Sequence, residues 1–217
     1  MAKKALRIQP PTPSSLVAAF AERNVEKSYV ALLNGLPDDG DGGSSGGGDD
    51  DVGSGDGDDN GGSGDGDDDV GWRTISSNVM GKEAVTKWRV MNYSQSLVAA
   101  DGYITQVLFK PKTGRFHQLR IHSSEVLGCP IVGDLEHDKG TESALKMREN
   151  GMFLCSSSVL LPHPTLKELP EEGEAKRWEG VEFVMKDGKV FLRAEIALPD
   201  KFAKTLRREG QRAKKLG

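Results

Sequence analysis

The residues from Arg115 to His122 have the greatest capacity for chemistry in this chain of 217 residues. These eight positions hold two arginines, two histidines and a glutamine, and an apolar turn follows from Gly128 to Asp134. Many hydrogen-bond donors beside an apolar segment indicate a pocket for a polyanion, because guanidinium groups bind phosphate through paired hydrogen bonds. The alternative is an ordinary solvated helix surface, on which paired arginines are common.

A helix is the element that would position these side chains, and the pattern predicts one over residues 116–127. On that helix His117, Arg120 and Ser124 share one stripe, and Arg115 lies just before its start. We therefore expect Arg115, His117 and Arg120 to converge near the helix N-terminus, where backbone N–H groups favour an anion.

Neither a metal nor a cofactor is expected. The five-residue spacing of His117 and His122 places them far apart around a helix, and no Cys/His ligand cluster is present. The two cysteines, Cys129 and Cys155, lie in apolar surroundings, which indicates buried thiols in a reducing, intracellular compartment, either the cytoplasm or an organelle. No apolar run approaches the length that a membrane span needs, so no membrane partner is expected.

The chain has one strongly acidic segment, and the rest of its sequence is basic. Residues 38–71 contain 13 Asp and 14 Gly, and we predict a disordered insertion there. The alternative is calcium binding, because residues 56–67 begin like an EF-hand loop. Without these 13 aspartates, 20 acidic residues remain against 29 basic ones, a net charge of +9. That balance favours a nucleic acid as partner, although a solvated lysine-rich surface would also account for it.

The remaining pattern predicts an α+β domain with a mixed, mostly antiparallel sheet and flanking helices. Thr12 and Pro13 can begin a helix, and Asp187-Gly188 can form a tight hairpin. The predicted strands are 28–33, 84–91, 97–100, 103–109, 152–161, 181–185 and 190–196, and residues 201–215 form a C-terminal helix. Residues 1–37 and 72–217 then form one domain that the insertion 38–71 interrupts.

Four segments of the chain resemble, in order, the RluA-type pseudouridine synthases. Residues 113–122 with 128–134 are similar to the family's T-G-R-x-H-Q-[IL]-R-[VI]-H…G-x-P-[IL]-x-G-D. Residues 20–32 are similar to its F-x-x-R-x-V-x-K-x-Y-x-A-L, and 81–90 to its G-K-x-A-x-T-x-Y-R-V, with Trp88 at the aromatic position. His163-Pro164 and Ala197-Leu198-Pro199 resemble its closing strands. The resemblance implies the pseudouridine synthase catalytic-domain fold, incomplete at the N-terminus.

The resemblance also implies roles for particular residues. Tyr29 would lie beside the target uracil, and Arg120 would pair with the catalytic aspartate. Without the resemblance, Tyr29 is an ordinary core aromatic of a strand. The residues that would help to shape the RNA-binding cleft are Lys27, Arg115, His117 and Gln118.

The implied reaction converts uridine in RNA to pseudouridine, breaking the bond from ribose to uracil N1 and forming one to C5. It needs no cofactor or metal. The resemblance also implies a monomer whose partner is ribosomal or transfer RNA. The nucleophilic aspartate belongs to an R-L-D-x-x-T-S-G loop that these 217 residues do not contain, and neither Asp101 nor Asp134 replaces it. Two hypotheses follow: a synthase whose N-terminal part is missing, or a non-catalytic RNA-binding pseudoenzyme or truncated remnant.

Overall fold

A single antiparallel sheet forms the centre of the computed structural model, which describes residues 10–22, 24–38, 71–138, 150–171 and 180–216. Its seven strands lie in the order β2-β3-β4-β1-β5-β7-β6, and every pairing between described strands is antiparallel. The strands are β1 (Glu26–Asn34), β2 (Arg73–Val79), β3 (Lys82–Gln95), β4 (Tyr103–Pro111), β5 (Leu154–Pro162), β6 (Val181–Lys186) and β7 (Lys189–Glu195). The predicted α+β fold with a mostly antiparallel sheet is confirmed.

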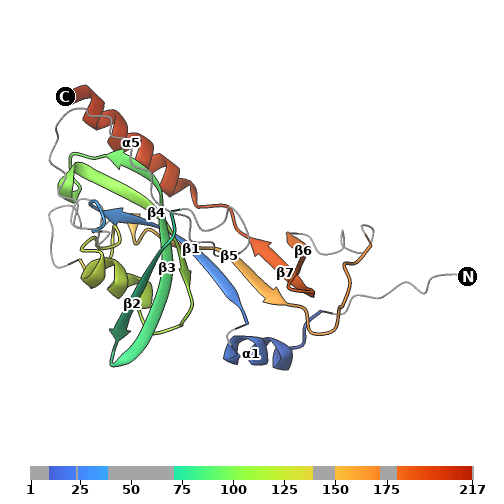
Figure 1. Cartoon of the computed structure of the whole chain (residues 1–217). Helices are drawn as coiled ribbons and strands as arrows, with labels where there is room; N and C mark the ends of the chain where they lie inside the picture. The colour runs from blue at the N-terminus through green and yellow to red at the C-terminus, as the bar shows by residue number, and fades with distance from the viewer. Residues whose placement is uncertain (1–9, 23, 39–70, 139–149, 172–179, 217) are drawn as a thin grey trace, which may run out of the picture.

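The helices lie on both sides of this sheet (Figure 1). They are α1 (Pro13–Ala21), the short η1 (Ala100–Gly102), α2 (Gln118–Ile121), the π-helical turn η2 (His122–Val126) and α5 (Asp200–Leu216). Among the described helices, none is both long and apolar enough to cross a membrane.

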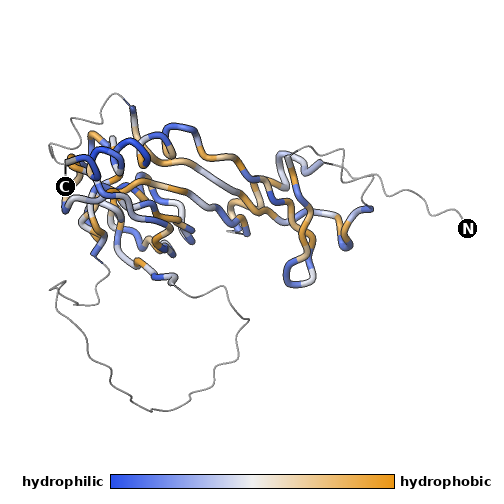
Figure 2. Tube along the Cα trace, turned by 90° about the horizontal axis from the view of Figure 1, so that it is seen from above, coloured by the Kyte–Doolittle hydropathy of each residue, from blue (hydrophilic) through white to orange (hydrophobic). Residues whose placement is uncertain are grey.

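The alternation of β1 side chains divides the core into two layers. Ala31 and Leu33 pack in one cluster with Leu119 of α2, whereas Val30 and Leu32 pack in a second cluster with Phe202 of α5. Successive side chains of a strand point to opposite faces, and burying one such side chain stabilises the fold by about 1.5–3 kcal/mol. In Figure 2 the strands carry long hydrophobic stretches while α5 is largely hydrophilic, so β1 and its neighbours supply most of the core.

Local signals predicted two elements closely. The Thr12 side chain accepts a hydrogen bond from the backbone N–H of Ser15, which caps α1 as its sequence indicates. Asp187 and Gly188 join β6 to β7 with φ angles of 48° and 69°, as a type I′ turn requires. Both predictions are confirmed.

Two local predictions were wrong, and one strand was missed. Residues 97–100 are not a strand but bends that lead into η1. The helix predicted over 116–127 begins only at Gln118, and its second half is π-helical. Strand β2 was not predicted, because Ile75 and Val79 are its only buried residues. The predicted disorder and its calcium-binding alternative fall almost entirely on residues 39–70, which lie outside the described residues.

The turn at Gly133 is held against the end of β1. The backbone N–H of Val132 donates to the Leu32 carbonyl, and Ile131 forms an isolated bridge with Leu33. Gly133 has a φ of +80°, and a Cβ there would lie 2.2 Å from the carbonyl oxygen of Gly151. This turn therefore needs glycine both for its backbone angle and for the close approach of residues 151–152.

We predict that Gly133→Ala lowers the free energy of unfolding by more than about 4 kcal/mol, since the backbone at Gly151 has to move. Gly102→Ala is the matched control, because Gly102 also has positive φ (+74°) but nothing lies within 4 Å of an added Cβ. The free energy of unfolding of the control should fall only by the cost of holding alanine in the left-handed conformation, about 1–2 kcal/mol. Urea unfolding of both variants measures the difference, and equal losses would contradict the packing argument.

Candidate functional site

The loop before α2 is fixed by the side chain of Gln118. Its Oε1 accepts hydrogen bonds from the Thr113 hydroxyl (2.7 Å) and from the backbone N–H of Arg115 (3.0 Å). Its Nε2 donates to the Val85 carbonyl (3.1 Å) and to Thr86 Oγ1 (2.9 Å) on β3. Gln118 is buried and its amide is fully used, so it shapes the loop from inside the protein.

His117 is held in an uncommon backbone conformation at the start of α2. Its φ and ψ are 52° and 21°, in the left-handed region that few non-glycine residues adopt. The ring of Phe116 stacks on its imidazole, with centroids 3.8 Å apart. Strained backbone that the surrounding structure holds in place is concentrated at functional sites, so this loop is a candidate for one.

Arg120 makes a two-pronged contact with Asp134. Its Nε donates to Oδ2 at 2.7 Å and its Nη2 to Oδ1 at 2.5 Å, and the Asp134 side chain is fully buried. Arg120 Nη2 also donates to Glu136 Oε2 at 3.0 Å. Burial alone would raise the pKa of Asp134, but the hydrogen bond from Arg120, with others from the backbone of His137 and Glu136, outweighs it, so the pKa is lowered.

The predicted convergence of three basic residues is confirmed for one pair only. Arg120 Nη1 lies 2.9 Å from His117 Nε2, so these two side chains meet. Arg115 Nε instead donates to the carbonyl of Glu83 (3.0 Å) at the β2–β3 hairpin. The left-handed turn at His117 changes the chain direction that a continuous helix would have given, and the Arg115 side chain follows another path.

Lys27 reaches the same loop from β1, and it lines a cavity of about 400 Å³. A methyl group added at Gly114 would lie 3.8 Å from Lys27 Nζ. The cavity has a strongly basic lining whose other lysines are Lys110, Lys112, Lys186 and Lys189.

The carboxyl group of Glu26 reports the potential in this cavity. Burial would raise the pKa of Glu26, but the hydrogen bond and charge of Lys186 and the charges of Lys112 and Lys110 outweigh that effect and lower it. The cavity therefore favours an anion.

Tyr29 lies on β1, two residues after Lys27. It is half-buried and packs against the cluster that contains Ala31 and Leu119. Tyr29 is thus on the sheet face that α2 covers, where its ring has one packed side. This placement fits the core interpretation and the family interpretation equally well.

Comparisons with known proteins agree on one family. An RNA pseudouridine synthase of Zymomonas mobilis is 35% identical over 121 residues, which cover 55% of this chain and 44% of that protein. The dual-specificity RNA pseudouridine synthase RluA of Haemophilus ducreyi is 36% identical over 89 residues, covering 41% and 36%. Ribosomal large subunit pseudouridine synthase C of Rickettsia felis is 38% identical over 81 residues, covering 37% and 23%.

Over the matched residues the chain is similar to the RluA-type pseudouridine synthases. The structure of human RNA pseudouridylate synthase domain containing 4 has the same fold, with a TM-score of 0.50 at 19% identity over 90% of this chain and 66% of that one. No family model matches the chain. The matched regions span less than half the length of these curated relatives.

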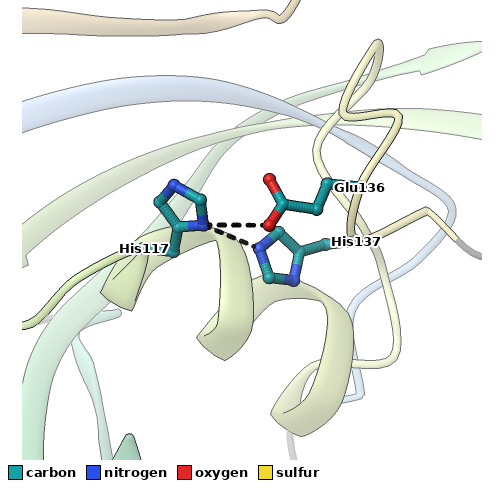
Figure 3. A group of neighbouring side chains, drawn as sticks. All are labelled: His117, Glu136 and His137. Carbon is teal, nitrogen blue, oxygen red and sulfur yellow. Dashed lines mark hydrogen bonds and ion pairs between the residues drawn. The ribbon is translucent and has the colours of Figure 1, made fainter. Parts of the chain in front are cut away.

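This similarity leaves the roles of individual residues as predictions. These concern Tyr29 and Arg120 at the reaction centre, and Lys27, Arg115, His117 and Gln118 in the cleft. The sequence analysis assigned no partner for Arg120 within these residues and took Asp134 as part of a structural turn. It also overlooked Glu136 and His137, which with His117 bring three potential metal ligands together (Figure 3).

We predict that Asp134→Asn destabilises the protein by about 3 kcal/mol or more, because it removes the buried carboxylate that pairs with the largely buried Arg120 charge. Asp200→Asn is the matched control, since the Asp200–Lys204 pair has side chains 85% and 73% exposed. Removing the charge of an exposed pair at a helix start should lower the free energy of unfolding by at most about 1 kcal/mol. Denaturant midpoints compare the two, and a loss as small as that of the control would show that the buried pair is not needed.

We predict a pH-dependent loss of stability that depends on His122. Burial lowers the pKa of His122, whose Nδ1 lies 3.0 Å from Thr86 Oγ1. The folded protein therefore binds its proton less readily than the unfolded chain does. The stabilisation is present above the unfolded pKa of about 6.5 and is lost as pH falls through the folded pKa.

The measurement is the melting temperature of the wild type and of His122→Asn between neutral and acidic pH. The wild type should lose stability more steeply below about pH 6.5, because asparagine keeps a hydrogen bond to Thr86 but does not titrate. The other three histidines are the same in both proteins, so the difference isolates His122. Parallel curves would contradict the prediction.

Proposed function

We propose that this chain is catalytic-domain sequence of an enzyme that isomerises uridine to pseudouridine in RNA. The observation that carries the proposal is the placement of Arg120. Asp134 holds the Arg120 guanidinium group through two of its nitrogen atoms, and α2, which carries Arg120, packs on the sheet face that Tyr29 contacts. The family relationship supplies the reaction, and the local geometry supports the assignment.

Arg120 is prepared to orient a carboxylate nucleophile. Asp134 accepts hydrogen bonds from Nε and Nη2 of Arg120, and these two bonds fix the plane of the guanidinium group. The third nitrogen, Nη1, lies beside His117. A positioned cation lowers the cost of bringing a charged nucleophile to the target nucleotide. Tyr29 would contact the uracil ring once that nucleotide is flipped out of its stack. The nucleophilic aspartate itself would come from the family's R-L-D-x-x-T-S-G loop.

The basic cavity is the proposed contact for the RNA backbone. Lys27 connects it to the loop of Gly114 and Arg115, and four further lysines line it. Phosphate contacts of this kind set the register of an RNA without reading its sequence. We infer ribosomal or transfer RNA as the substrate class, since the relatives named for their substrates act on the large ribosomal subunit or have dual specificity.

The experiment uses the purified 217-residue chain, alone and joined to the R-L-D-x-x-T-S-G loop of a relative, with ribosomal and transfer RNA labelled with tritium at uridine C5. Isomerisation moves the glycosidic bond to C5, so the tritium is released to water. We expect release by the protein with its nucleophile loop, and a rate at least about 100-fold lower in the Arg120→Ala variant. Arg207→Ala, at an exposed arginine of α5, is the control for loss of one positive charge.

Filter binding of the same RNAs separates the two hypotheses. Tritium release by the 217-residue chain excludes the non-catalytic alternative. Salt-dependent binding that weakens in Lys27→Ala, without tritium release even after the R-L-D-x-x-T-S-G loop of a relative is joined to the chain, supports the pseudoenzyme. An absence of both binding and release would overturn both hypotheses.

A further inference from the structure

Three potential metal ligands come together at the surface beside α2. His117 lies at the start of α2, and Glu136 and His137 lie in the turn after Asp134 (Figure 3). His117 Nδ1 is 3.2 Å from His137 Nε2 and 3.6 Å from Glu136 Oε1. All three ligand atoms lie within 4.8 Å of one another. Two imidazole nitrogens and one carboxylate oxygen thus face a common point.

These separations match the edges of a small coordination polyhedron. Donors about 2.0–2.1 Å from a tetrahedral Zn²⁺ ion are separated from one another by about 3.4 Å. The two measured distances from His117 Nδ1 fall on either side of that value. A metal ion could therefore be bound with small movements of these side chains, and a fourth position would remain for water or an external oxygen.

The turn that carries two of the ligands is already ordered. Asp134 Oδ1 accepts hydrogen bonds from the backbone N–H groups of Glu136 and His137, both at 3.2 Å. Glu136 uses Oε2 for Arg120, which leaves Oε1 directed at His117. Outer hydrogen bonds of this kind orient metal ligands and increase their affinity.

The nearby guanidinium group does not prevent metal binding. Arg120 Nη1 lies 2.9 Å from Nε2 and 3.2 Å from Nδ1 of the same ring. Because Nη1 is nearer to Nε2 than to Nδ1, it is not aligned with the Nδ1 lone pair alone, and a small movement of Arg120 would leave Nδ1 to a metal ion. The positive charge of Arg120 is met by two carboxylates, Asp134 and Glu136, so these three ionised groups are net negative.

We propose that His117, Glu136 and His137 form a binding site for a divalent transition-metal ion of the Zn²⁺ type. Nitrogen and carboxylate ligands in a small, partly exposed cluster favour such ions over Mg²⁺ or Ca²⁺, which prefer oxygen ligands alone. The sequence analysis expected no metal because it paired His117 with His122. His122 is buried against Thr86, and the actual partners come from a turn 20 residues further along the chain.

The test is metal binding to the tag-free 217-residue chain after treatment with a chelator. Titration with Zn²⁺ against a chromophoric chelator should reveal one tight site. Titration with Co²⁺ should give the intense visible absorption of a tetrahedral complex with nitrogen ligands. Glu136→Gln and His137→Gln should each weaken Zn²⁺ binding by about 100-fold or more, at least the loss expected for an outer-shell partner.

Glu125→Gln is the matched control, because Glu125 is an exposed glutamate of η2 outside the cluster. Every variant keeps the 13 aspartates of residues 38–71, so Zn²⁺ binding that survives in His137→Gln arises there or elsewhere and overturns the proposal. A wild-type chain without the tetrahedral Co²⁺ spectrum overturns it as well. Both substituted side chains lie at least partly at the surface, and circular dichroism verifies that the variants are folded. The result is independent of isomerase activity.

Discussion

The buried ion pair between Arg120 and Asp134 is the interaction on which the rest of the site depends. Placing two charges in the interior is costly unless their remaining hydrogen bonds are satisfied. Here Asp134 accepts from Arg120 through both oxygens, and Oδ1 also accepts from the backbone of Glu136 and His137. One carboxylate therefore joins α2 to the turn at Gly133. Ile131 and Val132 then join the turn at Gly133 to the end of β1.

This arrangement fixes Arg120 before any ligand arrives. Gln118 holds the preceding loop against β3, and the left-handed His117 sets the direction in which α2 begins. An arginine on an unconstrained helix surface would lose side-chain entropy when it bound a phosphate or a carboxylate. Because that cost is met during folding, the guanidinium group can act on a ligand at full strength. The strained backbone at His117 fits a site selected for geometry and not for local stability.

The features that could be predicted were those determined by a few neighbouring residues in the sequence. The Thr12 cap, the Asp187-Gly188 turn and the strand over residues 28–33 each depend on a few adjacent residues, and all three were found. Strand β2 was missed because its seven residues bury only Ile75 and Val79, and its pairing with β3 supplies the stability that its composition lacks. The pattern of residues 116–127 could not indicate that His117 adopts a left-handed conformation, which directs Arg115 away from Arg120.

The site could be predicted only where one segment contained it. Residues 113–122 identified Arg120, His117 and Gln118, but most of the residues that these side chains contact lie elsewhere in the sequence. The lysines of the basic cavity come from β1, from the end of β4 and from the β6–β7 hairpin, and Glu136 and His137 come from a turn. Glu136 connects the two sites, since one oxygen binds Arg120 and the other faces His117. A cation on the His117 side would withdraw carboxylate charge from Arg120 and strengthen the field of its guanidinium group towards an RNA phosphate. The proposed metal site and the proposed RNA site would therefore be coupled through this one carboxylate.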